Sequence, residues 1–98
     1  MILSIIIPVY NEEKTIIQIL EKIKKVSSNL VKYEVVVIND GSTDQTNSLL
    51  DKNKHLYDKL INNQSNRGKG FSVKQGILNS SGSHIIFQDA DLEYDPTD

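Results

Sequence analysis

Acidic side chains gather near the end of this 98-residue chain. In the stretch IIFQDADLEYDPTD, an apolar run at residues 85–87 is followed by carboxylates at positions 89, 91, 93, 95 and 98. Two carboxylates about 5 Å apart repel by roughly 3 kcal/mol at an effective dielectric constant near 20, so Asp89 and Asp91 need a proton, solvent or a cation between them. Hard divalent ions such as Mg²⁺ and Mn²⁺ favour carboxylate oxygens, and substrate phosphates often complete their coordination. The spacing is therefore compatible with a metal that bridges protein acids and a diphosphate. By itself it favours a solvated acidic loop, because two Asp residues at this spacing are common.

A second candidate for ligand binding is the loop NRGKG at residues 66–70. Gly68 and Gly70 can let backbone N–H groups approach an anion closely, while Arg67 and Lys69 supply positive charge. An ordinary turn before a helix can have the same composition. By itself the loop indicates only a candidate phosphate contact.

Composition narrows the function classes. The net charge of −2 gives no basic face for nucleic acid. The chain has no cysteine, so neither a disulfide nor a thiolate metal site can form. The longest apolar run, residues 5–9, is too short to span a bilayer, and no leader pattern precedes it. A single cytoplasmic domain is the default expectation.

Strand and helix patterns alternate along the chain, which predicts an α/β domain with a parallel sheet. Buried strands are expected at residues 3–9, 35–38 and 83–88, and a short, weaker strand at residues 59–63. An amphipathic helix is expected from about Glu12 to Ser28 with Asn11 as its N-cap, a second from the Ser-Thr-Asp after Gly41 to Tyr57, and a third through Leu78. Ligands bind beyond the carboxyl ends of parallel strands, so the polar clusters at residues 10–12, 39–42 and 89–91 should meet at one rim.

Four segments together resemble the N-terminal half of the family 2 glycosyltransferases, which are inverting, nucleotide-sugar-dependent enzymes: SIIIPVYNEEKTI, VVVINDGSTDQT, NRGKGFSVKQGI and IIFQDADLEYDP. The combination of NRGKG with QDADLEYDP is most similar to the dolichyl- and polyprenyl-phosphate hexosyltransferase branch. The resemblance implies a three-layer α/β/α, Rossmann-like nucleotide-diphospho-sugar transferase fold with a mostly parallel sheet. Residues 1–98 would be its nucleotide-sugar-binding half, and the acceptor-binding half would be absent.

The resemblance, together with the NRGKG loop, gives a set of candidate site residues. It implies that Asp91 is the catalytic residue that contacts metal and diphosphate, and that Mg²⁺ or Mn²⁺ is held by Asp89, Asp91 and Glu93. The chain departs from the family pattern at two positions. Asn39 replaces the first of two acidic residues at the end of the second strand. Lys74 replaces an Arg, whose guanidinium could donate two parallel hydrogen bonds to a phosphate. The candidate nucleotide-binding residues are Pro8, Tyr10, Glu12, Asp40, Gly68, Lys69 and Asp89.

The implied reaction is the metal-assisted transfer of a hexose, with inversion, from a donor of the GDP-mannose or UDP-glucose type to a polyprenyl phosphate. The catalytic base, where one is needed, would lie in the absent half, so we expect this chain alone to be inactive. A lipid-phosphate acceptor would bring the full-length form to the inner face of the membrane. The strand at residues 83–88 should form an open sheet edge, through which we expect a homodimer.

Three other functions fit the sequence less well. A soluble family 2 transferase could build a surface polysaccharide of the cell envelope on a saccharide acceptor, and the missing half would distinguish it. A non-catalytic remnant that binds nucleotide or metal is another alternative. A receiver-like domain would need an acidic pair after the first strand and a lone Asp after the third, where this chain has Asn11-Glu12 and Asn62-Asn63.

Overall fold

A computed structural model describes residues 2–26 and 31–90, and every structural statement below concerns these residues. Strands and helices alternate as the sequence predicts. The elements are β1 (Ile2–Val9), α1 (Ile16–Lys25), β2 (Lys32–Asp40), α2 (Thr46–Lys52), the short 3-10 helix η1 (Lys54–Leu56), β3 (Lys59–Asn63), α3 (Lys69–Asn79) and β4 (His84–Phe87).

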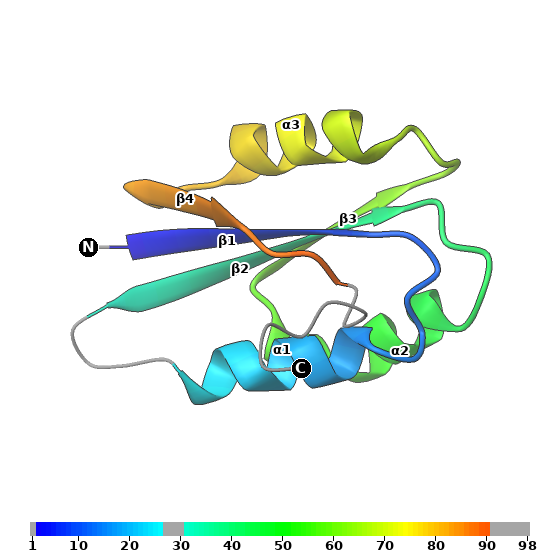
Figure 1. Ribbon diagram of the computed structural model, residues 1–98, viewed down its shortest axis with the longest axis horizontal. Coiled ribbons are helices and arrows are strands. Elements are labelled where there is room, and N and C mark those ends of the chain that lie inside the picture. Colours follow the sequence, from blue (N-terminus) through cyan, green and yellow to red (C-terminus); the bar gives the residue numbers. More distant parts are fainter. Residues whose placement is uncertain (1, 27–30, 91–98) are drawn as a thin grey trace, which may run out of the picture.

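The four strands form one parallel sheet in the order β3-β2-β1-β4. The central pair, β1 and β2, is aligned so that Ile6 lies opposite Val36. Helix α3 covers one face of the sheet, whereas α1 and α2 lie on the other (Figure 1). The three-layer α/β/α arrangement with a parallel sheet is thus confirmed, and β4 lies at an edge of the sheet as expected.

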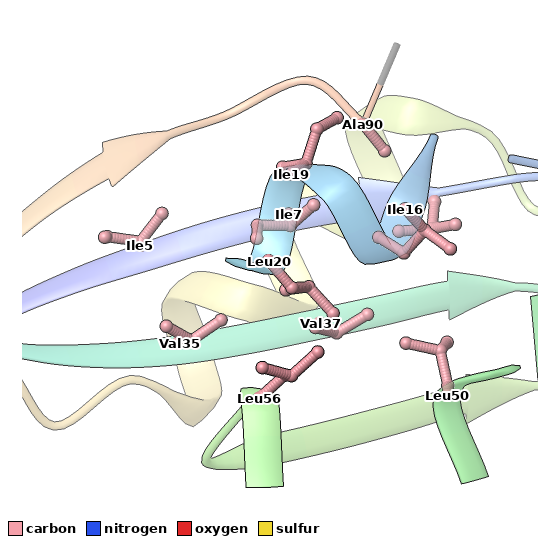
Figure 2. Packing of buried hydrophobic residues seen from close by; sticks show 11 residues of the cluster. Ile5, Ile7, Ile16, Ile19, Leu20, Val35, Val37, Leu50, Leu56 and Ala90 are labelled. Carbon is pink, nitrogen blue, oxygen red and sulfur yellow. The ribbon is translucent and has the colours of Figure 1, made fainter. Parts of the chain in front are cut away.

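Alternate residues of β1 and β2 point to opposite faces, as strand geometry requires. On one face Ile5, Ile7, Val35 and Val37 pack with residues of α1 and α2, including Leu20 and Leu50 (Figure 2). On the other face Ile6, Val36 and Ile38 form a smaller buried cluster beneath α3. Both central strands are therefore apolar on both sides, which explains their continuous runs of branched residues.

Helix α3 comes very close to the sheet at Gly76. A Cβ atom at this position would lie 2.4 Å from Cγ2 of Ile6 and 3.1 Å from Cδ1 of Ile38. Ile6 and Ile38 are both fully buried, so neither can move away easily. Glycine therefore permits the close contact between α3 and the two central strands.

The predicted start of the first helix is wrong. Asn11 is not its N-cap, because Asn11 has a left-handed backbone with φ of 53° and α1 begins only at Ile16. The Asn11 side chain instead accepts hydrogen bonds from the backbone N–H groups of Thr43 and Asp44, at 2.7 and 3.3 Å. A contact with residues more than 30 positions away has therefore replaced the local cap.

Several further boundaries differ from the prediction, whereas β3 has the predicted bounds. Strand β2 is longer than predicted at both ends, and the expected end of the first helix at Ser28 lies outside the described residues. The second helix was expected to reach Tyr57, but α2 ends at Lys52 and η1 follows it. Tyr57 lies in extended backbone, and its hydroxyl donates a 2.8 Å hydrogen bond to the carbonyl of Leu50. Strand β4 is shorter than expected at both ends, since its four residues end at Phe87.

Candidate functional site

A pocket of about 530 Å³ lies at the carboxyl ends of β1, β2 and β4, beside the first turn of α3. This is the rim at which the sequence predicted that the polar clusters meet. Each residue of the candidate nucleotide-binding set lines this pocket, namely Pro8, Tyr10, Glu12, Asp40, Gly68, Lys69 and Asp89. Segments that are distant in the sequence thus contribute to a single cavity.

Asp40 is a buried charged group of the pocket that accepts several hydrogen bonds. The residue is 4% exposed, and its carboxylate accepts hydrogen bonds from the backbone N–H groups of Arg67 and Gly68, at 2.9 and 2.8 Å, and from the Asn63 amide at 2.9 Å. Burial raises the pKa of Asp40, but these hydrogen bonds outweigh burial and hold the pKa below its usual range. Asp40 is therefore an ionised, acceptor-only group at neutral pH. The buried hydroxyl of Ser72 lies beside it, without a well-formed hydrogen bond within the described residues.

The bonds to Asp40 correct one expectation about the NRGKG loop. The glycines were expected to let backbone N–H groups of the loop approach a ligand, but the N–H of Gly68 donates to the protein's own carboxylate. Gly68 is nonetheless required by the backbone, since its φ is 96°. Arg67 does not line the pocket, and its guanidinium carbon lies 4.5 Å from the centre of the Phe71 ring. Lys69 is the cation of this loop that reaches the pocket.

The turn after β1 is held in place by the segment that follows β2. Side chains at residues 42–46 accept hydrogen bonds from three successive backbone N–H groups of the turn, which fixes the position of the Tyr10 and Glu12 backbone at the pocket. The three bonds are Asn11 N–H to Ser42 Oγ (3.0 Å), Glu12 N–H to Thr46 Oγ1 (3.0 Å) and Glu13 N–H to Asp44 Oδ2 (3.3 Å).

The beginning of the acidic segment is held from both faces of the sheet. Asp89 forms an ion pair with Lys69, with 2.5 Å between Oδ1 and Nζ. The next residue, Ala90, accepts a 2.5 Å hydrogen bond from the hydroxyl of Thr15, which directly precedes α1. Asp89 is thus placed at the pocket by contacts with α3 and with the start of α1.

The predicted metal set is only partly within reach of the structure. Asp91 and Glu93 lie outside the described residues, and so does the remainder of the acidic segment. Residues 2–26 and 31–90 contain no group of three His, Cys, Asp or Glu side chains that could hold a metal ion. The Asp89 carboxylate, which is two-thirds exposed at the pocket, is a hard oxygen donor of the type that Mg²⁺ and Mn²⁺ prefer.

Asn39, the departure from the expected acid, is buried and does not line the pocket. Its Nδ2 donates to the side-chain oxygens of Asn47 and Asn62. A carboxylate at this position would have no N–H to offer these two acceptors. Asn39 therefore ties β2 to β3 and α2 beneath the rim.

Sequence reasoning missed about half of the pocket's lining. Asn66 belongs to the NRGKG loop and Ala90 to the predicted cluster at residues 89–91, although neither was singled out. Helical spacing from Lys69 would have put Ser72 on the same face of α3. Backbone geometry, which no sequence motif signals, decides the others. The missed lining residues are Val9, Asn66, Ser72, Phe87, Gln88 and Ala90.

None of the helices in the described ranges has the length and apolar character of a membrane span. The sequence of the whole chain nevertheless matches known proteins over most of its length. The model of the family described as Glycosyl transferase family 2 matches residues 4–98.

Individual relatives agree with this match. A dolichyl-phosphate beta-glucosyltransferase from Mus musculus is 40% identical over 100 residues, covering 91% of this chain and 31% of the relative. The crystal structure of S. aureus TarS 1-349 in complex with UDP-GlcNAc has a TM-score of 0.81 at 31% identity, covering 93% of this chain and 27% of that one. The mannosyltransferase PcManGT from Pyrobaculum calidifontis, in complex with GDP-Man and Mn²⁺, has a TM-score of 0.79 at 29% identity, covering 91% and 27%. The chain thus spans about a third of the length of the curated relatives it matches.

Proposed function

Because the chain belongs to glycosyl transferase family 2, we propose that it forms the donor-binding part of an inverting glycosyltransferase and binds a nucleoside diphosphate sugar in the pocket at the sheet rim. The observation that carries this proposal is the convergence of one buried carboxylate, Asp40, and one cation, Lys69, in a single cavity. A nucleoside diphosphate needs both an acceptor for a base N–H group and positive charge near its phosphates.

The geometry suggests how the donor would lie. Asp40 would accept a hydrogen bond from the nucleobase, since it lines the pocket and its ionised carboxylate cannot donate. Lys69 and Asp89, at the rim, would lie near the diphosphate and its counter-ion. Tyr10, which is 43% exposed, is available to pack against the donor, and Pro8 and Glu12 complete the wall formed by the end of β1.

The proposed acceptor is a polyprenyl phosphate, and the proposed group transferred is a hexose. This assignment is supported by the dolichyl-phosphate beta-glucosyltransferase relative, which is 40% identical to the chain. A phosphate acceptor is already an anion at neutral pH, so it needs little help from a general base. Such an acceptor would place the full-length protein at the inner face of a membrane.

A divalent ion, Mg²⁺ or Mn²⁺, is the proposed cofactor, with Asp89, Asp91 and Glu93 as its protein ligands and Asp91 as the residue closest to the reaction. Support comes from the exposed Asp89 carboxylate and from the Mn²⁺ in the PcManGT complex. A bound ion of this kind would stabilise the negative charge on the departing nucleoside diphosphate. The protein groups would hold the donor in place and keep its diphosphate aligned for displacement.

Titration calorimetry with UDP-glucose and GDP-mannose, in the presence and absence of Mn²⁺, tests the proposal. We expect one of these donors to bind, with tighter binding in Mn²⁺, and we expect Asp91→Ala to remove the effect of the metal. An Asp51→Ala variant is the matched control, because Asp51 is exposed on α2 and does not line the donor pocket. Absence of binding by either donor under all conditions would reject the proposed function.

A further inference from the structure

Lys69 and Asp89 form a direct contact at the rim of the pocket. Lys69 is the first residue of α3, Asp89 lies two residues beyond β4, and their charged atoms are 2.5 Å apart. Both side chains are 66% exposed, so the pair is solvated and can separate at little cost. This contact therefore links the start of α3 to the segment after β4 by an interaction that can break easily.

Lys69 also supplies the positive charge of a pocket that is otherwise acidic. Lys69 is the sole Lys or Arg that lines the pocket within the described ranges, whereas Glu12, Asp40 and Asp89 are its acids. Three hydrogen bonds from the protein already stabilise the ionised carboxylate of Asp40, so it depends less on a cation. The ammonium of Lys69 consequently has two competing roles, since it neutralises Asp89 now and is the cation available to an incoming diphosphate.

A divalent ion and the ammonium cannot share the same carboxylate oxygen. An ion bound to Oδ1 of Asp89 would lie within a few ångströms of Nζ, and the two cations would repel each other. Lys69 must therefore leave Asp89 when a metal binds there. A diphosphate in the pocket offers the ammonium a new anionic partner and lowers the cost of that move.

We propose that Lys69 is a built-in counter-cation that occupies Asp89 in the donor-free pocket and transfers to the diphosphate when donor and metal bind. Binding of the metal and of the nucleoside diphosphate is then positively coupled through this one side chain. The inference rests on the proposed function, and it adds a coupling device to the same site. Reciprocity requires that each ligand strengthens the binding of the other by the same factor.

The test is the affinity for Mn²⁺, measured from the electron paramagnetic resonance signal of the free ion, with and without UDP or GDP. In Lys69→Met, Mn²⁺ should bind about two- to fivefold more tightly without nucleotide, the range expected when an exposed ion pair is removed. The same variant should bind the nucleotide more weakly, and the mutual enhancement should fall. Lys69→Arg keeps the charge and should retain most of the enhancement.

Lys22→Met is the matched control, because Lys22 lies in the last turn of α1, is exposed and does not line the pocket. It should behave like the wild type. If wild type binds Mn²⁺ and nucleotide but Lys69→Met leaves both affinities and their coupling unchanged, the role of Lys69 is wrong and donor binding stands. If wild type binds neither UDP nor GDP at any Mn²⁺ concentration, both the coupling and the proposed function are wrong.

Discussion

The hydroxyl of Thr15 donates a 2.5 Å hydrogen bond to the carbonyl oxygen of Ala90, 75 residues further along the chain. Ala90 is buried in the same apolar cluster as Ile16 and Ile19 of α1. The residue between Asp89 and Asp91 is therefore anchored by both a hydrogen bond and apolar contacts. This anchor sets where the acidic segment leaves the sheet.

Thr15→Val should show how much this anchor contributes. Valine has nearly the same shape but cannot donate, so the buried carbonyl of Ala90 loses its partner. We expect the free energy of unfolding to fall by about 1–3 kcal/mol in urea denaturation. Thr15→Ser keeps a hydroxyl and should lose less, and equal losses in the two variants would argue against the hydrogen bond.

Replacement of Asp40 tests the role of its carboxylate in folding. Asp40→Ala leaves two backbone N–H groups and the Asn63 amide without their acceptor, so the unfolding free energy should fall by about 1–3 kcal/mol. Nucleotide binding should be lost in the same variant. Asp51→Ala removes an exposed carboxylate that pairs with Lys54 at 3.4 Å, and it should change stability by less than about 0.5 kcal/mol.

Glu34 makes a prediction for acid stability at the opposite end of the sheet. Burial raises its pKa, but hydrogen bonds from Ser81, Ser4 and Lys59 outweigh burial and lower the pKa from 4.5 to about 2. A carboxylate with a lowered folded-state pKa stabilises the protein above its unfolded-state value, and this contribution disappears as the pH falls.

Stability should therefore decline between about pH 4.5 and pH 2, by at most about 3 kcal/mol from this group. Glu34→Gln should be less stable at pH 7 and should lose less stability over that acid range. Chemical denaturation at a series of pH values measures both effects. Parallel pH curves for the variant and the wild type would contradict the assignment.

Two glycines should respond in opposite ways to alanine. Gly41 has a φ of 75°, and an added Cβ would lie 2.4 Å from the backbone carbon of Ser65. Gly41→Ala should therefore destabilise the protein by at least about 1 kcal/mol. Gly70, in the first turn of α3, has open space around an added Cβ, so Gly70→Ala should be neutral or stabilise by up to about 1 kcal/mol. Thermal denaturation of the pair makes the comparison.

The open edge at β4 predicts self-association. Ile85, Ile86 and Phe87 are 37–53% exposed, and within the described ranges β4 pairs only with β1. An apolar strand edge of this kind pairs readily with another strand. We expect a concentration-dependent dimer in analytical ultracentrifugation, which Ile86→Lys should weaken. Leu78→Lys, on the outer side of α3, should not weaken it, and a monomeric wild type at high concentration would refute the prediction.

Much of the fold was predictable because it depends on local patterns. The continuous apolar runs of β1 and β2 predict central parallel strands. Because the strands are parallel, Tyr10, Asp40 and Asp89 then lie at one rim of the sheet. Helix starts were less predictable. The side chain of Asn11 accepts a hydrogen bond from the backbone N–H of Thr43, 32 residues away, and does not cap the helix that follows it. The partners of Asp40 were missed for the same reason, because they depend on how the loop at residues 66–70 folds back over β2.

Gly76 does not line the pocket, but it influences the width of the pocket. Any side chain there would push α3 outward from the central strands, and Gly68 and Lys69, at the start of the same helix, would shift with it. The distance between Asp40 and Lys69 in the donor site thus depends on the absence of a side chain at Gly76, about two helical turns from Lys69. Variation at this position would tune ligand affinity without touching a ligand-contacting atom.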